Sequence, residues 1–477
     1  MKYYNFFEYV AEQSNKDRRI FEIETQKFST YEEVINNALL IGKSLYQYDQ
    51  KIVSVILPNS ISYIECFLAC MATNNIFNPI PYFIEPQELK KTLSYIDPKL
   101  IISDRQDIDP KYKKMQPEML LNNNIRIIPK INDVDDIASL YYSSGTTGNP
   151  KGVLYSHKNM ISLIRSIIDG FEFKSSDNQL AFLPFGHTAA INYNILPVLM
   201  NGSNLYVSKG FEFMRDNFFE VLEKYQINYT QIVPTILYML LKLKVDISSL
   251  NLSHLRFIGC GSSTLPLVSQ QEFIDLYNIK LANLYGLSET GPCHIDNPLE
   301  KGWTPGSIGK PLDVNECRIS KSGEILLKGD NIFIGYHKNE KLYKEAVQNG
   351  WFKTGDLGYK KNEKYFFIDR KKDLIIKGAI NIVPMEIEEV IYKHPEIHEC
   401  VVVGRNNKIF GEEIIAVVVP LNDIDDIKLK KDIRLLCKAE LSNYKVPSTV
   451  LVWKELPKTL SNKLLRRKVR ELVNENY

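Results

Sequence analysis

The feature that most constrains the fold is a loop rich in glycine and hydroxyl side chains between two short apolar segments. Residues 141–152 read Tyr-Tyr-Ser-Ser-Gly-Thr-Thr-Gly-Asn-Pro-Lys-Gly. The segments 137–142 and 153–155 have the composition of strands, so we expect a strand–loop–strand element. Glycines let backbone N–H groups approach an anion, and the hydroxyls and Lys151 add donors and charge. The loop therefore predicts a polyphosphate site.

The same residues exclude the ordinary P-loop of nucleoside triphosphatases. That loop opens a helix and requires lysine followed by serine or threonine. Here Lys151 stands between Pro150 and Gly152. A solvated turn of glycine and serine is the alternative, but such turns seldom collect this many phosphate donors beside a lysine.

Length and composition limit the class of protein. A chain of 477 residues predicts two or three domains, and 44% hydrophobic with 24% charged residues is ordinary for a globular protein. The net charge of +2 gives no reason to expect nucleic acid or an anionic membrane as partner. We also expect no secretion signal, no transmembrane segment and a cytoplasmic location. The seven scattered cysteines show no metal-binding spacing and are expected to be small buried hydrophobic residues.

The first part of the chain alternates helical and strand patterns. An amphipathic run ends near Leu45 and begins after Ser29 or Thr30, either of which can cap a helix. The segments 52–57, 76–80 and 100–103 are apolar and read as buried strands. Alternating strands and helices predict an α/β fold with a largely parallel sheet.

Three later strand ends carry small or polar residues. Residues 180–188 end in a Pro/Gly turn that presents His187, and the strands near 255 and 280 run into Gly259 and Gly286. Ligands of open α/β sheets bind at the carboxyl ends of the strands. A structural histidine and two ordinary turns are the alternative interpretation.

The second half becomes rich in strands and carries two acidic features. Asp356 is expected in a glycine turn, where it either accepts two ribose hydroxyls or forms an Asx turn. The charged run 369–373 is either a solvated linker or a domain boundary, and we place the boundary there. The basic residues after 463 predict a C-terminal helix.

Five motifs in this order resemble those of the adenylate-forming (AMP-binding) enzymes, of the acyl- and aryl-CoA synthetase type. They are the loop 141–152, Tyr285-Gly286-Leu287-Ser288-Glu289, Thr354-Gly355-Asp356, the run 369–373, and Leu456-Pro457-Lys458-Thr459 followed by Lys463. The resemblance covers nearly the whole chain. It implies a large N-terminal domain (1–369) of α/β subdomains with a small β-barrel-like part. A hinge (370–372) and a small mobile α+β C-terminal domain (373–477) follow.

The resemblance also implies roles for residues. The catalytic residues are Lys463, Glu289 and His187: Lys463 is the catalytic lysine, Glu289 ligates Mg²⁺, and His187 also borders the acyl pocket with Gly259 and Gly286. Lys372 is the pivot, and Gly378 lines the thiol tunnel. The ATP- or AMP-binding set comprises Ser143, Ser144, Gly145, Thr146, Thr147, Gly148, Lys151, Gly261, Ser262, Ser263, Asn283, Leu284, Tyr285, Gly286, Ser288, Asp356 and Arg370.

These roles imply activation of a carboxylic acid by ATP to an acyl-adenylate with release of pyrophosphate. Transfer to a thiol follows, with coenzyme A or the phosphopantetheine arm of a carrier protein as acceptor. Residues 185–194 contain no acid to pair with an α-amino group, so we expect a fatty acid, as in fatty acid metabolism, or an aromatic acid. Luciferase-type oxidation, a non-catalytic nucleotide-binding relative and a protein-interaction module are the alternatives. Four residues, Ser288, Ala379, Leu460 and Asn462, depart from the common pattern of the family.

Overall fold

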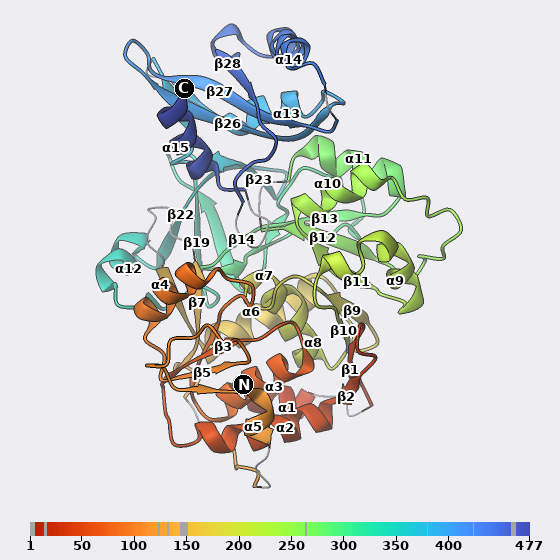
Figure 1. Cartoon of the computed structure of the whole chain (residues 1–477), viewed down its shortest axis with the longest axis vertical. Helices are drawn as coiled ribbons and strands as arrows, with labels where there is room; N and C mark the ends of the chain where they lie inside the picture. The colour runs from red at the N-terminus through yellow and green to blue at the C-terminus, as the bar shows by residue number, and fades with distance from the viewer. Residues whose placement is uncertain are drawn as a thin grey trace.

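The computed structural model describes residues 5–13, 17–121, 125–130, 133–143, 151–262, 265–378, 380–422, 424–458 and 464–477. A large N-terminal body carries a smaller C-terminal lobe, at the top of Figure 1. The chain passes from body to lobe after β23 (Lys364–Arg370). The body contains two seven-stranded sheets and one five-stranded sheet, and the lobe contains another five-stranded sheet. This mixed architecture agrees with the predicted α/β class.

The first seven-stranded sheet contains the predicted strand–loop–strand element. Strands β7 (Ile137–Ser143) and β8 (Lys151–Ser156) pair antiparallel, which confirms that prediction. The neighbours β3, β4 and β5 are parallel to one another, as the alternating pattern requires. The remaining elements are β20 (Gly335–Tyr336), β4 (Ile76–Pro79), β3 (Ile52–Ile56), β5 (Leu100–Ser103), β6 (Lys114–Met115), α2 (Tyr31–Leu45), α3 (Ile61–Ala72), α4 (Pro86–Ile96) and α5 (Pro117–Leu121).

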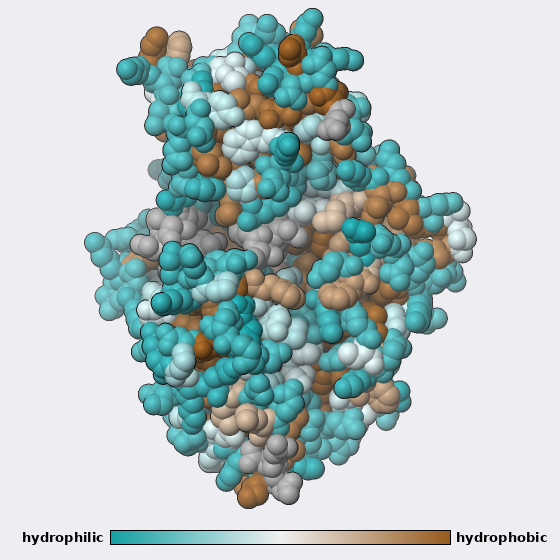
Figure 2. Space-filling model, in the orientation of Figure 1, coloured by the Kyte–Doolittle hydropathy of each residue, from teal (hydrophilic) through white to brown (hydrophobic). Residues whose placement is uncertain are grey.

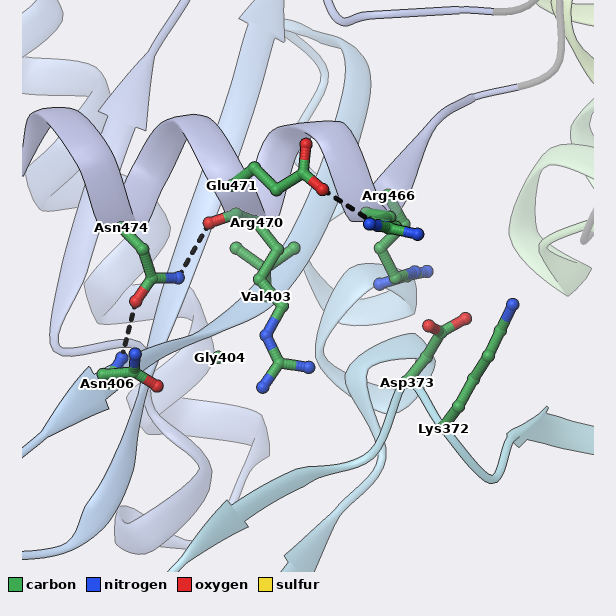
Figure 3. Close-up of a pocket in the computed structure, with 10 residues that line it drawn as sticks. Lys372, Asp373, Val403, Gly404, Asn406, Arg466, Arg470, Glu471 and Asn474 are labelled. Carbon is green, nitrogen blue, oxygen red and sulfur yellow. Dashed lines mark hydrogen bonds and ion pairs between the residues drawn. The ribbon is translucent and has the colours of Figure 1, made fainter. Parts of the chain in front are cut away.

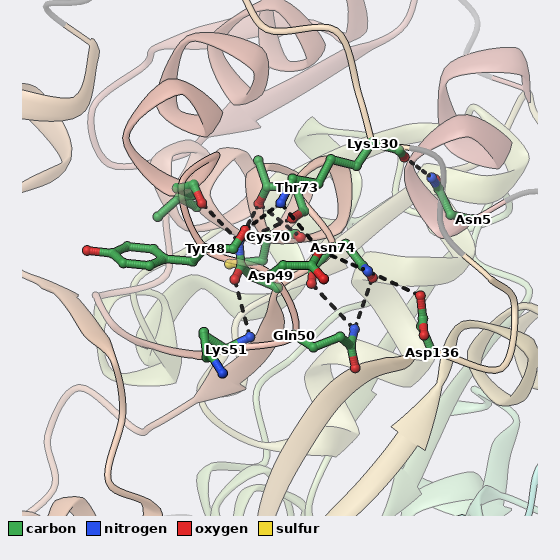
Figure 4. A network of polar contacts seen from close by, with 12 residues as sticks. Asn5, Tyr48, Asp49, Gln50, Lys51, Cys70, Thr73, Asn74, Lys130 and Asp136 are labelled. Atoms are coloured by element: carbon green, nitrogen blue, oxygen red, sulfur yellow. Dashed lines mark hydrogen bonds and ion pairs between the residues drawn. The ribbon is translucent and has the colours of Figure 1, made fainter.

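Helix α2 begins where a capping residue was predicted. The Thr30 side chain accepts from the Glu33 backbone N–H, and the Glu33 carboxylate accepts from the Thr30 N–H, a reciprocal capping box. A polar network fixes the amino ends of the parallel strands (Figure 4). In it, Gln50 Nε2 donates to the Ile137 carbonyl at 3.0 Å and Asn74 Nδ2 donates to Asp136 at 3.1 Å. These bonds hold the amino ends of the strands together. The motifs lie at the opposite, carboxyl ends.

The second seven-stranded sheet has the order β13-β12-β11-β9-β10-β1-β2 and is parallel except for the β1–β2 hairpin. A continuous hydrophobic core joins it to the first sheet through helices α3, α6 and α8. Its strands are β13 (Leu281–Leu284), β12 (Phe257–Gly261), β11 (Tyr229–Ile232), β9 (Asn178–Ala181), β10 (Asn204–Val207), β1 (Arg19–Glu22) and β2 (Phe28–Thr30). Its helices are α1 (Phe6–Gln13), α6 (His157–Gly170), α7 (Thr188–Ala190), the π-helix η1 (Ile191–Ile195), α8 (Leu196–Asn201), η2 (Phe211–Phe213), η3 (Arg215–Asn217), α9 (Phe218–Lys224), α10 (Pro234–Leu243) and α11 (Leu267–Tyr277).

An antiparallel sheet forms the β-rich part of the body. Asp356 lies within its long strand β22 (Trp351–Lys361), so the prediction of a turn at that residue is wrong. Gly355 has φ +74°, and a bulge follows at Leu357 and Gly358, so the glycines distort the strand without ending it. The other elements are β14 (Gly286–Leu287), β15 (Gly291–Pro292), β16 (His294–Ile295), β17 (Lys310–Pro311), β18 (Asn315–Ile319), β19 (Glu324–Gly329), α12 (Glu340–Ala346), β21 (Val347–Gln348) and β23.

The C-terminal lobe has its own two cores, one on each face of its sheet. Side chains alternate along β26, so Val402 packs with α13 and α14 while Val401 and Val403 pack with α15. The lobe comprises β24 (Ile375–Lys377), β25 (Ile380–Ile382), α13 (Pro384–Ile391), β26 (Ile397–Asn407), β27 (Gly411–Pro420), α14 (Asp426–Glu440), η4 (Asn443–Lys445), β28 (Thr449–Val452) and α15 (Arg466–Asn476). The predicted basic C-terminal helix is therefore present.

The surface in view is mainly hydrophilic, with hydrophobic residues in small separate groups (Figure 2). No helix in the described part of the chain is both long enough and apolar enough to cross a membrane. All seven cysteines are free; six are buried as predicted, whereas Cys317 is only partly buried.

Candidate active site

A cavity of about 1010 Å³ lies where the strand ends of both seven-stranded sheets meet the C-terminal lobe. Strand β8 contributes Lys151 to its wall, and Leu284 ends β13 there. The lobe contributes Lys458 and Leu465. Ten of the predicted site residues line this one cavity: Lys151, His187, Ser262, Leu284, Gly286, Ser288, Glu289, Asp356, Arg370 and Lys372.

Other predicted residues lie behind the cavity wall or outside the described part of the chain. Gly259, Gly261, Asn283 and Tyr285 are in or beside strands β12 and β13 and are not among the lining residues. Gly378 is in the β24–β25 turn of the lobe, also away from this wall; its φ is +58° and its N–H donates to the Phe410 carbonyl at 2.7 Å. The predicted residues outside the described ranges are Ser144, Gly145, Thr146, Thr147, Gly148, Ser263 and Lys463, together with the side chain of Ser143.

The strands β22 and β23 bring Asp356 and Arg370 together as neighbours. Their backbones are paired in register, and Arg370 Nε lies 3.3 Å from Asp356 Oδ1. The Tyr285 hydroxyl donates to Asp356 Oδ2 at 2.8 Å. Burial, and next the charge of Asp356, hold the pKa of Tyr285 well above its ordinary value, so the phenol remains a donor. The carboxylate is thereby fixed at the cavity wall although only 2% of the residue is exposed.

A second acidic group lies beside the lysine of the glycine-rich loop. Tyr336 donates its hydroxyl to Glu289 Oε1 at 2.8 Å, and Lys151 Nζ lies 5.4 Å from the centre of the Tyr336 ring. Strand β20 carries Tyr336 and pairs with β8, which begins at Lys151. Tyr336 could not be recognised from the sequence, because its contact with Glu289 depends on a strand pairing between distant segments. One Glu289 oxygen accepts this bond, and the carboxylate lines the cavity on the Lys151 side.

The glycines of this region permit close packing of the strand ends. A Cβ on Gly261 would lie 2.6 Å from Leu284 Cβ and 2.7 Å from its carbonyl oxygen, so only glycine fits there. A Cβ on Gly286 would lie 2.3 Å from the Gly291 carbonyl oxygen. The small residues predicted at these turns are thus required by the backbone geometry of the wall.

Another part of the wall is formed by the segment that follows β9. His187 precedes the short helix α7 and lines the cavity, as predicted. The chain then forms the π-helix η1, which places Asn192 and Tyr193 on the cavity wall. Single-turn π-helices are often found at functional sites. No periodicity in the sequence indicates this π-helix, and neither residue was singled out from the sequence.

The C-terminal lobe reaches the cavity through the two ends of the segment 459–463. Lys458 and Leu464 form an isolated bridge, and the Leu465 N–H donates to the Pro457 carbonyl at 2.9 Å. Lys458 Nζ also pairs with Glu399 at 2.5 Å. Both flanks of Lys463 are therefore held together at the rim of the cavity, although Lys463 itself lies outside the described residues.

A smaller cavity of about 460 Å³ lies between the turn after β23 and helix α15. Figure 3 shows Lys372 and Asp373 on one side of it and residues of α15 on the other. Arg466 is held there by Glu388 in a two-pronged ion pair at 2.5 and 2.9 Å. Burial, and then the charge of Arg370, lower the pKa of Lys372, which lines both cavities.

Comparison with known proteins agrees with this geometry. Residues 7–337 match the family model "AMP-binding enzyme", and residues 386–463 match "AMP-binding enzyme C-terminal domain". The chain belongs to the AMP-binding enzyme family. The predicted resemblance is thereby confirmed, and with it the class of AMP-forming acid–thiol ligases.

The relatives of this family member are CoA ligases. It is 30% identical over 450 residues to a sulfoacetate–CoA ligase of Cupriavidus necator, with 87% of this chain and 86% of the relative covered. It is 32% identical over 342 residues to a 2-succinylbenzoate–CoA ligase of Listeria monocytogenes, with 71% of each covered. The crystal structure of the anthranilate CoA ligase AuaEII in complex with anthranoyl-AMP matches 99% of this chain and 98% of its own, with a TM-score of 0.90 and 22% identity. At that identity the structural match establishes the fold alone.

Proposed function

We propose that this enzyme activates a small carboxylic acid with ATP and transfers the acyl group from the adenylate to coenzyme A. The observation that carries the proposal is the convergence of Lys151, Glu289, Asp356 and Arg370 on one cavity that the lobe also reaches. These residues come from four separate segments of the chain. The two relatives described above are named CoA ligases, which favours coenzyme A over a carrier-protein arm. A cytoplasmic location accords with that acceptor.

In the first half-reaction a carboxylate oxygen attacks the α-phosphorus of ATP, and the bond to pyrophosphate breaks. Enzymes assist such displacements mainly by positioning and by stabilising charge. Asp356 would accept the ribose hydroxyls, with Arg370 beside it. Lys151 and the loop 143–148 would hold the phosphates that leave as pyrophosphate.

The chemistry of the Glu289 carboxylate fits Mg²⁺. This ion prefers oxygen ligands and is usually held by one or two carboxylates together with substrate phosphates. Glu289 provides a carboxylate on the Lys151 side of the cavity, steadied by Tyr336. No cluster of three or more His, Cys, Asp or Glu side chains suited to a metal occurs among the described residues, which accords with an ion carried by ATP. Bound there, the ion would neutralise charge on the phosphates.

We assign the catalytic charge at the α-phosphate to Lys463. Its flanking residues Lys458 and Leu465 line the cavity, so the six-residue segment 459–464 between them can deliver an ammonium group to the reacting carboxylate. We further propose that residues 370–372 are the hinge between domains 1–369 and 373–477. Rotation there would withdraw Lys463 and bring Gly378 toward the site, where the thiol attacks the acyl carbonyl and AMP leaves.

The test separates the two half-reactions. Acid-dependent exchange of pyrophosphate into ATP, measured with a panel of carboxylic acids, reports the first, and CoA consumption from a supplied acyl-adenylate reports the second. Lys463→Ala should abolish exchange and spare thioester formation. Lys468→Ala, which removes an exposed lysine of α15, is the matched control and should leave both rates unchanged. Equal loss of both steps in Lys463→Ala would contradict the assignment of Lys463 to the adenylation step. Transfer of the acyl group only to a carrier protein would contradict coenzyme A as the acceptor.

A further inference from the structure

The acid-binding end of the cavity has a polar floor whose groups lack partners. Tyr193 lines the cavity, and its hydroxyl is buried without a hydrogen-bond partner among the described residues. The same holds for the Tyr229 hydroxyl and for both side-chain polar atoms of Gln231 on β11. All three residues are at most 5% exposed. They therefore form a group of uncharged donors and acceptors behind the acyl pocket.

Strand register places these groups on the cavity side of the sheet. Gln231 pairs with Gly259 of β12, and Gly259 pairs with Ala282 of β13, so the three stand in one row. Side chains alternate between the two faces of a strand. Val233 lies two residues after Gln231, Leu284 lies two residues after Ala282, and both line the cavity. The row that contains Gln231 is thus the next layer inward on the same face.

Two of the three residues in this row are small, and the phenol of Tyr229 packs against one of them, Gly259. A Cβ on Gly259 would lie 2.6 Å from Leu284 Cδ1 and 2.8 Å from the Tyr229 hydroxyl oxygen. The hydroxyl of Tyr229 therefore lies over Gly259, directly behind the cavity-lining Leu284. Tyr193 approaches the same region from η1, because both tyrosines pack against the Phe171 ring, at 6.5 and 6.2 Å between ring centroids.

Buried polar groups without partners are unfavourable, and native structures usually satisfy them with protein, water or ligand. The floor offers hydroxyls and a carboxamide but no charged side chain. The charge of Arg256, which precedes β12, is balanced by Asp177 at 2.8 Å, and its guanidinium donates to the Glu172 carbonyl at 3.0 Å, although its buried Nε has no partner among the described residues. A second carboxylate would therefore lack a counter-ion here, whereas a hydroxyl, which both donates and accepts, matches the floor.

We propose that Tyr193, Tyr229 and Gln231 select a carboxylic acid that carries a hydroxyl group at the end remote from its carboxylate. This inference rests on the proposed acid-activating function and specifies its substrate class. A saturated fatty acyl chain would leave the floor without partners, and a site built to bind a substrate hydroxyl rejects an analogue that lacks it. The three residues are specificity determinants and take no part in the bond-forming step.

The test compares acids that differ by one hydroxyl. Pyrophosphate exchange is measured with 4-hydroxycinnamate against cinnamate and with 8-hydroxyoctanoate against octanoate, which separates a ring from a chain. We expect kcat/KM to favour the hydroxylated member of at least one pair by about tenfold or more. Tyr193→Phe and Gln231→Leu should reduce that ratio toward one. Tyr277→Phe is the matched control, since Tyr277 is buried and its hydroxyl donates to the Leu240 carbonyl at 2.7 Å away from the cavity; it should keep the ratio.

The outcomes distinguish this inference from the proposed function. If exchange occurs and the acids without a hydroxyl are used equally well or better in both pairs, the polar-floor inference is overturned and the proposed function stands. If no acid supports exchange, the proposed function fails, and the same acids are then compared by equilibrium binding to the unmodified protein. Tighter binding of a hydroxylated acid that Tyr193→Phe abolishes would still support the floor, and its absence would overturn it.

Discussion

Replacing Asp356 by asparagine tests the proposal that this cavity binds the ribose of ATP. The substitution preserves size and removes the charge of a residue that is only 2% exposed. The two carboxylate oxygens now face different partners, Tyr285 at 2.8 Å and Arg370 at 3.3 Å. Asparagine can direct its amide nitrogen to the Tyr285 oxygen and its carbonyl to Arg370, so the fold should survive. The side-chain carbonyl of asparagine can accept a hydrogen bond from one ribose hydroxyl, whereas the two carboxylate oxygens of aspartate can accept from both.

The expected loss is one charge-assisted hydrogen bond to the nucleotide. Such a bond contributes about 2 kcal/mol, which corresponds to roughly a 30-fold rise in the KM for ATP. The assay is acid-dependent pyrophosphate exchange with ATP, 2′-deoxyATP and 3′-deoxyATP. The wild-type enzyme should discriminate against at least one deoxynucleotide, and Asp356→Asn should discriminate much less. The substitution removes the acceptor and the deoxynucleotide removes the donor of the same hydrogen bond, so their effects should not add.

The control for this experiment is Asp313→Asn, which neutralises an exposed aspartate of the same part of the chain outside the cavity. It should leave the KM for ATP and the discrimination unchanged. If Asp356→Asn weakens ATP, 2′-deoxyATP and 3′-deoxyATP by the same factor as one another, Asp356 does not contact the ribose. Its effect would then come from the loss of the ion pair with Arg370.

Two further predictions concern buried contacts. Burial, opposed by the hydrogen bond from Asn37, raises the pKa of Glu65 from 4.5 to about 7. Between pH 4.5 and 7 the carboxyl of Glu65 is protonated in the folded protein and ionised in the unfolded chain. The free energy of unfolding therefore falls as pH rises through this range, by about 3 kcal/mol from this group. Glu65→Gln should be more stable than wild type at pH 8 and similar at pH 4.5 in urea unfolding; parallel pH profiles would contradict this. Tyr336→Phe removes the hydrogen-bond donor to Glu289 and should raise the Mg²⁺ concentration that gives half-maximal pyrophosphate exchange about tenfold. An unchanged Mg²⁺ dependence would contradict the proposal that Tyr336 positions Glu289 for the metal ion.

Local sequence patterns predicted those parts of the site that depend on short segments. The hairpin β7–β8 follows from two apolar segments around a glycine-rich loop, and the cap at Thr30 follows from the spacing to Glu33. Strand ends were predicted to carry ligands, and Glu289 and Ser262 do line the cavity. Each of these properties is determined by residues that are near one another in the chain.

The parts that escaped prediction depend on contacts between distant segments. Tyr336 reaches Glu289 only because β20 joins the edge of the first sheet. Asp356 was expected in a turn, since a glycine precedes it, yet strands β19 and β23 on both sides keep β22 extended through that glycine. The π-helix that presents Tyr193 follows no regular hydrophobic period, so its turn could not be recognised from spacing.

The way the lobe is attached bears on the proposed hinge. The hydrophobic cores of the lobe begin at Ile375, and the core of the body ends at Phe367, so no buried cluster of the described residues spans the junction. Across it, Tyr238 stacks on Tyr392 at 5.6 Å between ring centroids, Lys242 reaches the Leu421 carbonyl at 3.4 Å, and the Met385 N–H donates to the buried Asp369 carboxylate at 3.1 Å. A ring stack contributes about 1 kcal/mol and an exposed lysine contact less.

Displacing the lobe would therefore leave both of its cores and the core of the body intact, and would break the ring stack and the polar contacts just described. The turn after β23 is the place where such a movement acts on both cavities at once, because Lys372 lines each of them. Rotation about this residue would open the cavity that contains Asp356 and Glu289 while it changes the arginine-lined cavity beside α15. In the proposed hinge movement, the position of the lobe and the composition of the candidate active site would thus be coupled through residues 370–372.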